Sequence, residues 1–271
     1  MAGLTNNPFR GLLPFEEQHA PLFFGRDKEI QEVASRLERQ RLLAITGVSG
    51  SGKSSLVMAG VIPMLRAGLI PKLGTHVRVA LVKPRGGPLF ELQRQLSNAL
   101  NREVKQDDLI RTTYGLVDVV KPLSLDESLL IVVDQFEEIF SYRKQRANDS
   151  GATADRFMTL LLRATEQAEV PIFVMLTMRS DFLGECAVFR GLPEALNNAH
   201  YLVPKMTRLQ LQEAIEEPLA AAGTAIHAGL VQQILNECED EPDYLPVLQH
   251  LLFRMFAQGA LAGRPEPERK G

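Results

Sequence analysis

The chain consists of short apolar runs separated by amphipathic stretches through most of its length. Each run contains a few nearly continuous Val, Ile, Leu, Phe or Met residues. Such a run is too short for a buried helix and is typical of a strand covered on both faces. We therefore predict buried strands at residues 42–45, 77–82, 129–134, 171–179 and 200–203.

Helical periodicity fills the intervals between these runs. Asp27 can cap a helix whose apolar face carries Ile30, Val33, Ala34 and Leu37. Further helices are predicted from residue 54 and at 90–100, 107–120 and 157–168. Pro63 and Gly68 are expected to end the first of these, and the polar stretch 143–155 is expected to be a loop. Strands that alternate with helices predict an α/β fold around a parallel sheet.

From Thr207 onward the periodicity is helical only. One helix face carries Leu211, Ile215, Leu219 and Ala222, and further helices are predicted at 230–238 and 244–256. Helices without an intervening strand predict a small helical lid domain that follows the α/β domain. The expected division is an N-terminal arm at 1–26 packing on the core, an α/β domain at 27–205, a lid at 206–258, and a polar tail or linker start at 259–271.

Composition narrows the class of protein. The 271 residues are 45% hydrophobic and 23% charged with a formal net charge of -3, as in an ordinary globular protein without a nucleic-acid surface. Two cysteines, Cys186 and Cys238, are expected to be buried free thiols in a reducing compartment. No apolar run is long enough to span a membrane and no signal peptide is visible, so we expect a cytoplasmic protein.

The first chemical motif follows the predicted strand at 42–45. Residues 47–54 read Gly-Val-Ser-Gly-Ser-Gly-Lys-Ser, which fits the phosphate-binding loop G-x-x-x-x-G-K-[ST] between a strand and a helix. Its glycines let successive backbone N–H groups point inward around a phosphate, and the helix N-terminus adds partial positive charge. The predicted nucleotide-binding residues are Gly47, Val48, Ser49, Gly50, Ser51, Gly52, Lys53, Ser54 and Ser55.

Two side chains of this loop have distinct roles. Lys53 is expected to reach the β- and γ-phosphates of ATP, and the Ser54 hydroxyl is expected to hold Mg²⁺. The histidines show no spacing typical of metal ligands, so Mg²⁺ is the metal that we expect.

The second chemical motif is the acidic end of the strand at 129–134. Asp134 would lie at the carboxyl edge of the sheet, where a carboxylate can support Mg²⁺. Glu137 or Glu138 can position the attacking water, and both remain open, with Glu138 preferred. Arg179, at the end of the next strand, is the candidate sensor of the γ-phosphate.

Together these motifs resemble those of STAND-class NTPases (signal-transduction ATPases with numerous domains), and in particular the novel STAND group, which is NACHT- and AP-ATPase-like and occurs in bacterial multidomain proteins. The resemblance covers nearly the whole chain. It is carried by Asn7-Pro8-Phe9-Arg10-Gly11-Leu12, Phe24-Gly25-Arg26, residues 47–54, Asp134-Gln135-Phe136-Glu137-Glu138, Thr177-Met178-Arg179-Ser180-Asp181 and Leu245-Pro246-Val247-Leu248-Gln249.

The resemblance implies a P-loop three-layer sandwich with parallel strands ordered 5-1-4-3-2. It also implies that Arg26, preceded by Gly25, and Pro246 flank the adenine, and that Arg179 acts as sensor. Such modules are switches that are closed with ADP and self-associate with ATP. Family members usually carry sensor and effector domains, which are not visible in this chain.

We therefore expect an ATP- or ADP-binding switch with slow, Mg²⁺-dependent ATP hydrolysis, which regulates a signalling or defence protein and forms a homo-oligomer in the ATP state. One alternative is a nucleotide-binding regulatory scaffold with negligible turnover. The other is an AAA-type or origin-recognition-like DNA ATPase, which the charge of the chain disfavours.

Overall fold

The structure is a computed structural model that describes residues 7–124, 126–145, 150–238 and 244–261. Its contacts divide the chain into two compact units. The unit that we call the α/β unit comprises Glu29–Val48 and Val61–Val203, and the helical unit comprises Met1–Lys28, Ser49–Gly60 and Pro204–Gly271. The P-loop is therefore shared, because Gly47 and Val48 belong to the α/β unit and its other residues to the helical unit.

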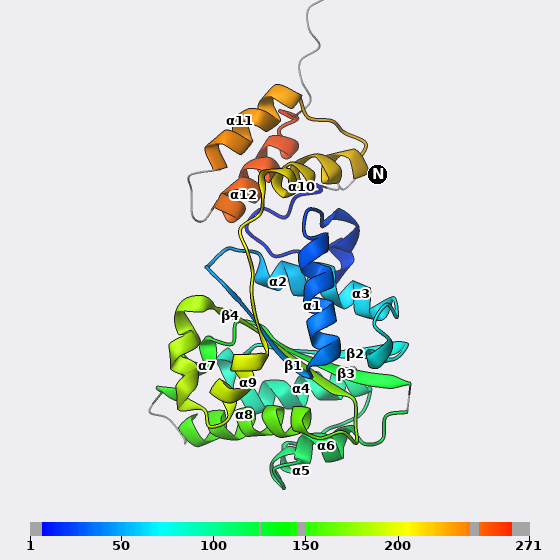
Figure 1. Cartoon of the computed structure of the whole chain (residues 1–271), viewed down its shortest axis with the longest axis vertical. Helices are drawn as coiled ribbons and strands as arrows, with labels where there is room; N and C mark the ends of the chain where they lie inside the picture. The colour runs from blue at the N-terminus through cyan, green and yellow to red at the C-terminus, as the bar shows by residue number, and fades with distance from the viewer. Residues whose placement is uncertain (1–6, 125, 146–149, 239–243, 262–271) are drawn as a thin grey trace, which may run out of the picture. The chain divides into compact units, whose positions relative to one another are not determined.

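A five-stranded parallel sheet forms the centre of the α/β unit (Figure 1). Its strands are β1 (Leu42–Gly47), β2 (His76–Val82), β3 (Glu127–Val133), β4 (Ile172–Arg179) and β5 (His200–Leu202). They are ordered β2-β3-β4-β1-β5, and each neighbouring pair is parallel. The predicted α/β fold and strand order are thus confirmed, and each predicted apolar run is a strand.

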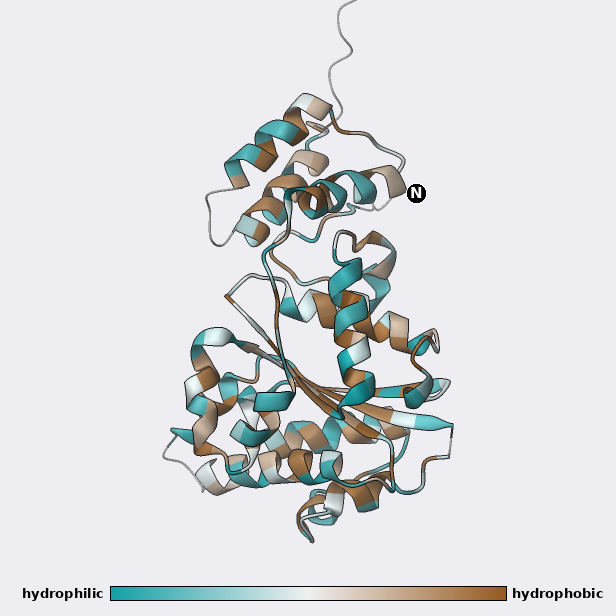
Figure 2. Cartoon of the chain, in the orientation of Figure 1, coloured by the Kyte–Doolittle hydropathy of each residue, from teal (hydrophilic) through white to brown (hydrophobic). Residues whose placement is uncertain are grey.

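Both faces of the central strands are covered, as their continuous apolar sequences predict. Every residue of β1 is buried, and so are all residues of β3 after the first. Helices α4 and α8 lie on one face of the sheet, and α1 and α3 lie on the other (Figure 1). Most of the length of the central strands carries the hydrophobic colour, whereas the helices show alternating hydrophobic and hydrophilic bands (Figure 2).

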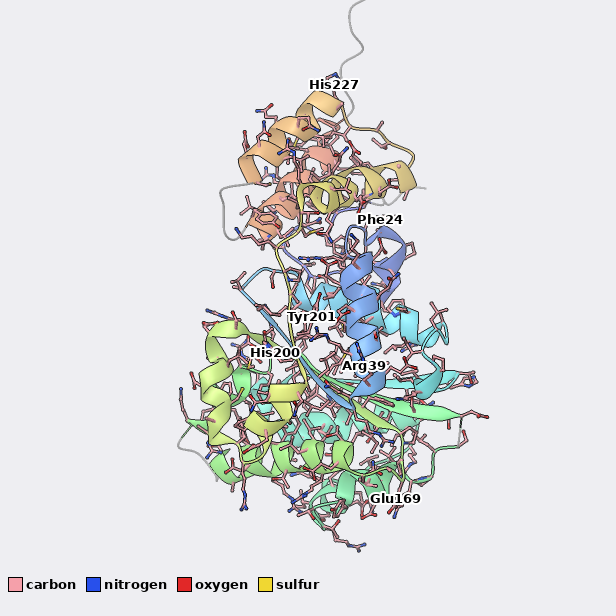
Figure 3. The ribbon with its side chains drawn as sticks, viewed as in Figure 1. Phe24, Arg39, Glu169, His200, Tyr201 and His227 are labelled. Carbon is pink, nitrogen blue, oxygen red and sulfur yellow. The ribbon has the colours of Figure 1, made fainter. Side chains whose placement is uncertain are left out.

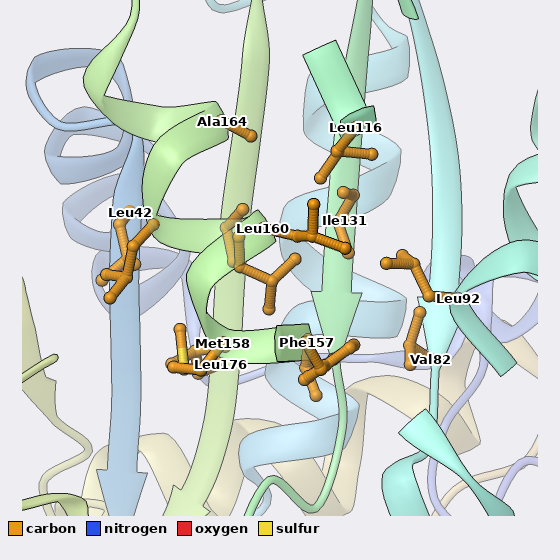
Figure 4. Packing of buried hydrophobic residues seen from close by; sticks show 14 of the residues in the cluster. Leu42, Val82, Leu92, Leu116, Ile131, Phe157, Met158, Leu160, Ala164 and Leu176 are labelled. Atoms are coloured by element: carbon orange, nitrogen blue, oxygen red, sulfur yellow. The ribbon is translucent and has the colours of Figure 1, made fainter. Parts of the chain in front are cut away.

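One face of the sheet packs against α8 through a continuous hydrophobic cluster. Phe157, Met158, Leu160 and Ala164 of α8 point toward the strands (Figure 4). Because burial of a large apolar side chain contributes about 1.5–3 kcal/mol, this layer stabilises the packing of α8 on the sheet. The two cysteines are free and buried, as predicted, and burial raises the pKa of Cys186 to about 11.

The helices of the α/β unit have the following bounds. They are α1 (Asp27–Arg39, beginning in the helical unit), α3 (Ile62–Arg66), α4 (Pro88–Leu100), α5 (Gln106–Ile110), α6 (Gly115–Val120), α7 (Glu138–Arg143), α8 (Ser150–Glu166) and α9 (Leu192–Asn198). Arg36 of α1 contacts the short strand β5: it donates to the His200 carbonyl at 2.7 Å, and its guanidinium lies over the Tyr201 ring. His200 and Tyr201 are labelled in Figure 3.

Three sequence predictions about helices are wrong in detail. The predicted helix at 107–120 is two helices, because Arg156 of α8 binds the carbonyls of Ile110 and Thr112 and ends the first one. The predicted loop at 143–155 becomes helical at Ser150, where Ala154 is buried and Asp155 pairs with Arg143; residues 146–149 lie outside the described residues. Tertiary contacts override local polarity in both cases.

The third difference follows the P-loop. Helix α2 (Lys53–Ser55) continues through a π-helical turn at Leu56–Val61 into α3, so Pro63 does not end the helix. Pro63 lies in the first turn of α3, directly after the π turn, where a missing backbone N–H is tolerated. Gly68 follows the end of α3, as predicted.

The helical unit contains α10 (Arg208–Ala221), α11 (Ala228–Cys238) and α12 (Tyr244–Ala257) around their own core. Leu211, Ile215 and Leu219 face this core, whereas Ala222 is exposed because α10 ends before it. Phe9 of the N-terminal segment is 1% exposed and belongs to the same core. Most of the predicted tail at 259–271 lies outside the described residues.

Candidate nucleotide site

The carboxyl edge of the sheet collects three predicted site residues within the α/β unit. Gly47, the first P-loop residue, is the register partner of Arg179 across β1 and β4. Asp134 directly follows β3, which pairs with the other side of β4. Parallel strands bring residues distant in sequence to one edge, and here Gly47, Asp134 and Arg179 share it.

Asp134 is held at this edge by a buried hydroxyl. Its side chain is almost completely buried, and the Thr177 hydroxyl donates to its Oδ1 at 2.6 Å. Its Oδ2 lies 3.9 Å from Nζ of Lys83, which follows β2. A buried carboxylate is costly unless it is hydrogen-bonded and charge-compensated, and Thr177 and Lys83 provide both.

Thr177 also fixes the turn that leaves β3. Its hydroxyl accepts from the Gln135 amide at 3.1 Å, and its carbonyl accepts from the Phe136 amide at 2.8 Å. Gln135 adopts a positive φ of 56°, which is uncommon for a residue other than glycine. One threonine therefore orients both the carboxylate of Asp134 and the backbone that follows it.

Glu137 and Glu138 lie where this turn enters α7. Glu137 precedes the helix, Glu138 is its first residue, and both side chains are half-buried. One carboxylate oxygen of Glu137 is fully buried. This difference does not assign the water to either residue, so both remain candidates for positioning it.

Arg179 points toward its own chain segment. It donates from Nε to Asp181 Oδ1 at 3.1 Å and from a terminal nitrogen to Asp181 Oδ2 at 2.7 Å. Its guanidinium lies over the Phe182 ring, 5.5 Å from the centroid. Phe182 in turn stacks on Phe140 of α7, so an aromatic contact connects the end of β4 with the helix that follows the Asp134 turn.

The rest of the P-loop is described within the helical unit. Gly50 has a φ of 72°, and a Cβ there would lie 2.7 Å from Cγ of Pro246, so the proline ring of α12 packs directly on the loop. Arg26, 4% exposed, donates to the Ser51 carbonyl at 3.3 Å and to the Pro204 carbonyl at 3.0 Å. The two residues expected near the adenine thus both contact the loop.

Further contacts fix the start of α2. Lys53 Nζ lies 3.4 Å from the Ser51 hydroxyl, and the Ser55 hydroxyl accepts from the Phe15 amide at 3.1 Å. Ser54 is half-buried in the same turn, and Ser49, Gly52 and Val48 complete the loop. Gly25 packs on the backbone of α10, where a Cβ would lie 2.3 Å from the Gln210 carbonyl oxygen, so it positions Arg26.

The donors available for a metal suit Mg²⁺. Taken separately, the Ser54 hydroxyl of the helical unit and the Asp134 carboxylate of the α/β unit are each hard oxygen ligands of the type that Mg²⁺ prefers, usually beside phosphate and water oxygens. Asp134 Oδ1 already accepts the Thr177 proton, which leaves Oδ2 directed at a cation, here the Lys83 ammonium. By the chemistry of its oxygen atoms, each residue therefore fits this metal.

Sequence reasoning missed several residues of this edge. Thr177 lies in a recognised motif, but its bond to Asp134 depends on the pairing of β3 with β4. Lys83 follows a predicted strand, and this position at a strand end was the signal in the sequence that could have identified it. The Asp181 side chain could have been suspected from its spacing of two residues from Arg179.

Comparison with protein families gives one match over most of the chain. The model of the family described as Novel STAND NTPase 1 matches residues 8–265. None of the curated proteins compared with the chain matches it. Among the described residues, the helices are all too short or too polar to cross a membrane.

Solved structures share the fold at low identity. The ORC2 protein of Aeropyrum pernix in ADPNP–ADP complexes is 16% identical with a TM-score of 0.57, over 88% of this chain and 65% of that chain. Cdc6p from Pyrobaculum aerophilum is 13% identical with a TM-score of 0.53, over 87% of this chain and 61% of that one. Drosophila ORC bound to DNA is 16% identical with a TM-score of 0.56, over 97% and 67%. This chain therefore spans less than two thirds of the first two proteins.

Proposed function

This chain belongs to the Novel STAND NTPase 1 family, and on that premise we propose that it is an ATP/ADP-binding switch with slow, Mg²⁺-dependent ATP hydrolysis. As a STAND-class NTPase domain it belongs to a class that binds nucleotides. The proposal adds that the bound nucleotide controls a cytoplasmic signalling or defence protein, through a conformational change and self-association in the ATP state.

The observation that carries the proposal is that Gly47, Asp134 and Arg179 share the carboxyl edge of the sheet. Gly47 begins the P-loop beside Arg179, and Asp134 is held by Thr177 on the other side of β4. Within the α/β unit, the start of the phosphate-binding loop thus shares the carboxyl edge of the sheet with a carboxylate that can support a metal and a guanidinium that can detect a γ-phosphate.

Each group has a defined task in this proposal. The P-loop amides and Lys53 bind the phosphates, while Ser54 and Asp134 hold Mg²⁺. The metal, when bound, neutralises charge that develops on the phosphate oxygens. Glu138 or Glu137 orients the attacking water, and Arg179 distinguishes ATP from ADP.

The adenine side of the proposal rests on the helical unit. Arg26 and Pro246 both contact the P-loop, and Gly25 fixes the approach of Arg26 to it. We infer that they flank the base, so that the helices of this unit respond to the nucleotide on the loop.

The test identifies the nucleotide that the protein retains and its effect on assembly. Protein purified without added nucleotide is denatured, and the released nucleotide is identified by chromatography. We expect stoichiometric ADP, and light scattering should show a monomer with ADP and a larger species with a non-hydrolysable ATP analogue. A protein that neither retains nor binds adenine nucleotides would contradict the proposal, and a monomer under all conditions would remove self-association from it.

Hydrolysis should depend on one of the two glutamates. Positioned acid–base groups contribute roughly a hundredfold or more to a rate, so Glu138→Gln is expected to lower phosphate release from Mg-ATP about a hundredfold. Glu137→Gln, which removes a charge from the adjacent residue, should stay within about tenfold of the parent. The reverse pattern would assign the water to Glu137, and two variants with parental rates would exclude both residues.

A further inference from the structure

We propose that Asp181 competes with the γ-phosphate of ATP for Arg179 and thereby sets how strongly the switch prefers ATP over ADP. This inference rests on the proposed function, because it assumes that Arg179 is the γ-phosphate sensor. It assigns a specificity-determining role to a carboxylate that belongs neither to the P-loop nor to the metal-binding residues.

The geometry of the pair is that of anion recognition. Arg179 donates to both carboxylate oxygens of Asp181, at 3.1 and 2.7 Å. A guanidinium presents the same pair of N–H groups to a carboxylate and to a phosphate. Asp181 therefore occupies the donors that a γ-phosphate would use.

The pair is exposed enough to be exchanged. The Arg179 and Asp181 side chains are 45% and 55% exposed. Ion pairs in contact with solvent are weak, so a phosphate held by the P-loop can displace such a carboxylate. ADP lacks the γ-phosphate and has no group with which to displace it.

The support behind Arg179 keeps its guanidinium in place during the exchange. Phe182 lies beneath the guanidinium, and its ring stacks on Phe140 at 5.9 Å with an interplanar angle of 6°. Phe140 is itself 2% exposed. Because Arg179 is the register partner of Gly47, its backbone lies beside the first residue of the P-loop.

The thermodynamic consequence is selective. If ATP must break the Arg179–Asp181 pair before it binds fully, the apparent ATP affinity falls by the free energy of that pair. The affinity for ADP is unaffected, because ADP leaves the pair intact. Asp181 would thus lower the affinity for ATP relative to that for ADP and favour the ADP-bound state.

The experiment measures the binding of ADP and of a non-hydrolysable ATP analogue to the full chain, both with Mg²⁺. Asp181→Asn keeps the shape of the side chain and removes its charge. We expect it to tighten binding of the ATP analogue roughly threefold to fivefold and to leave ADP binding unchanged.

Glu185→Gln provides the matched control. Glu185 lies on the same 3₁₀-helical segment, Ser180–Val188, and its carboxylate binds Lys144 at 2.9 Å. This variant removes an identical charge without touching the Arg179 pair, so both affinities should stay parental. In an Arg179→Ala background, Asp181→Asn should likewise have no effect on the ATP analogue.

Three outcomes would overturn the inference. They are an unchanged affinity for the ATP analogue in Asp181→Asn, an equal gain for ADP, and an equal gain from Glu185→Gln. The proposed sensor fails separately, if Arg179→Ala leaves the preference for the ATP analogue over ADP unchanged. If Arg179→Ala reduces that preference and Asp181→Asn does not raise it, the sensor stands and only the competition is rejected.

Discussion

Replacement of Lys53 by alanine is expected to weaken ATP binding about a hundredfold or more. Truncation of one partner of a desolvated charge pair costs about 2–5 kcal/mol, and about 2.7 kcal/mol corresponds to a hundredfold change. The loss should arise at the β- and γ-phosphates, which we propose that Lys53 contacts from the first turn of α2. Titration with a fluorescent ATP analogue measures the change.

Two further variants distinguish the loss of the Lys53 charge from a general effect of substitution on the fold. Lys53→Met keeps much of the side-chain length without the charge and should lose nearly as much affinity as Lys53→Ala. Lys72→Ala removes an exposed lysine from a different segment and should bind ATP like the parent. Because Lys53 is only half-buried, thermal unfolding of nucleotide-free protein should change little. Micromolar ATP affinity in Lys53→Ala would reject the assignment of the phosphate site.

The strands were predictable because a strand that is buried on both faces has a continuous run of apolar residues. β1 and β4 have such runs, and the predicted ends of both strands lie within two residues of the observed ends. The P-loop was predictable for a different reason, because phosphate binding by backbone amides needs glycines at fixed positions. The strand order itself came from the family resemblance, since apolar runs do not state which strands pair.

The contacts that organise the site were not predictable because they depend on that pairing. Thr177 meets Asp134 only when β4 lies beside β3, and the sequence separates the two by 43 positions. The end of α5 was not predictable for the same reason, because it depends on Arg156 of α8, which donates to the carbonyl of Ile110. Local propensity is a weak guide where a distant side chain supplies the hydrogen bonds.

Asp134→Asn is expected to abolish the effect of Mg²⁺ on ATP binding and to lower hydrolysis about a hundredfold or more. An amide oxygen is a weaker ligand than a carboxylate for a hard divalent cation, and removal of a functional metal ligand costs a large part of the metal-dependent step. Binding of ATP in the presence of EDTA should remain parental, because the P-loop and Lys53 are unchanged. Titrations with and without Mg²⁺ measure both quantities.

Folding should survive this substitution for a reason visible in the structure. The asparagine side chain would keep an oxygen acceptor where the Thr177 hydroxyl now reaches Asp134 Oδ1, and it would no longer bury a charge beside Lys83. Asp118→Asn is the control, because Asp118 is an exposed acid paired with Lys121 at 3.8 Å and should leave the Mg²⁺ effect intact. If Asp134→Asn and the parent respond equally to Mg²⁺, the buried carboxylate serves the structure of the strand edge alone, and the metal is held by other groups.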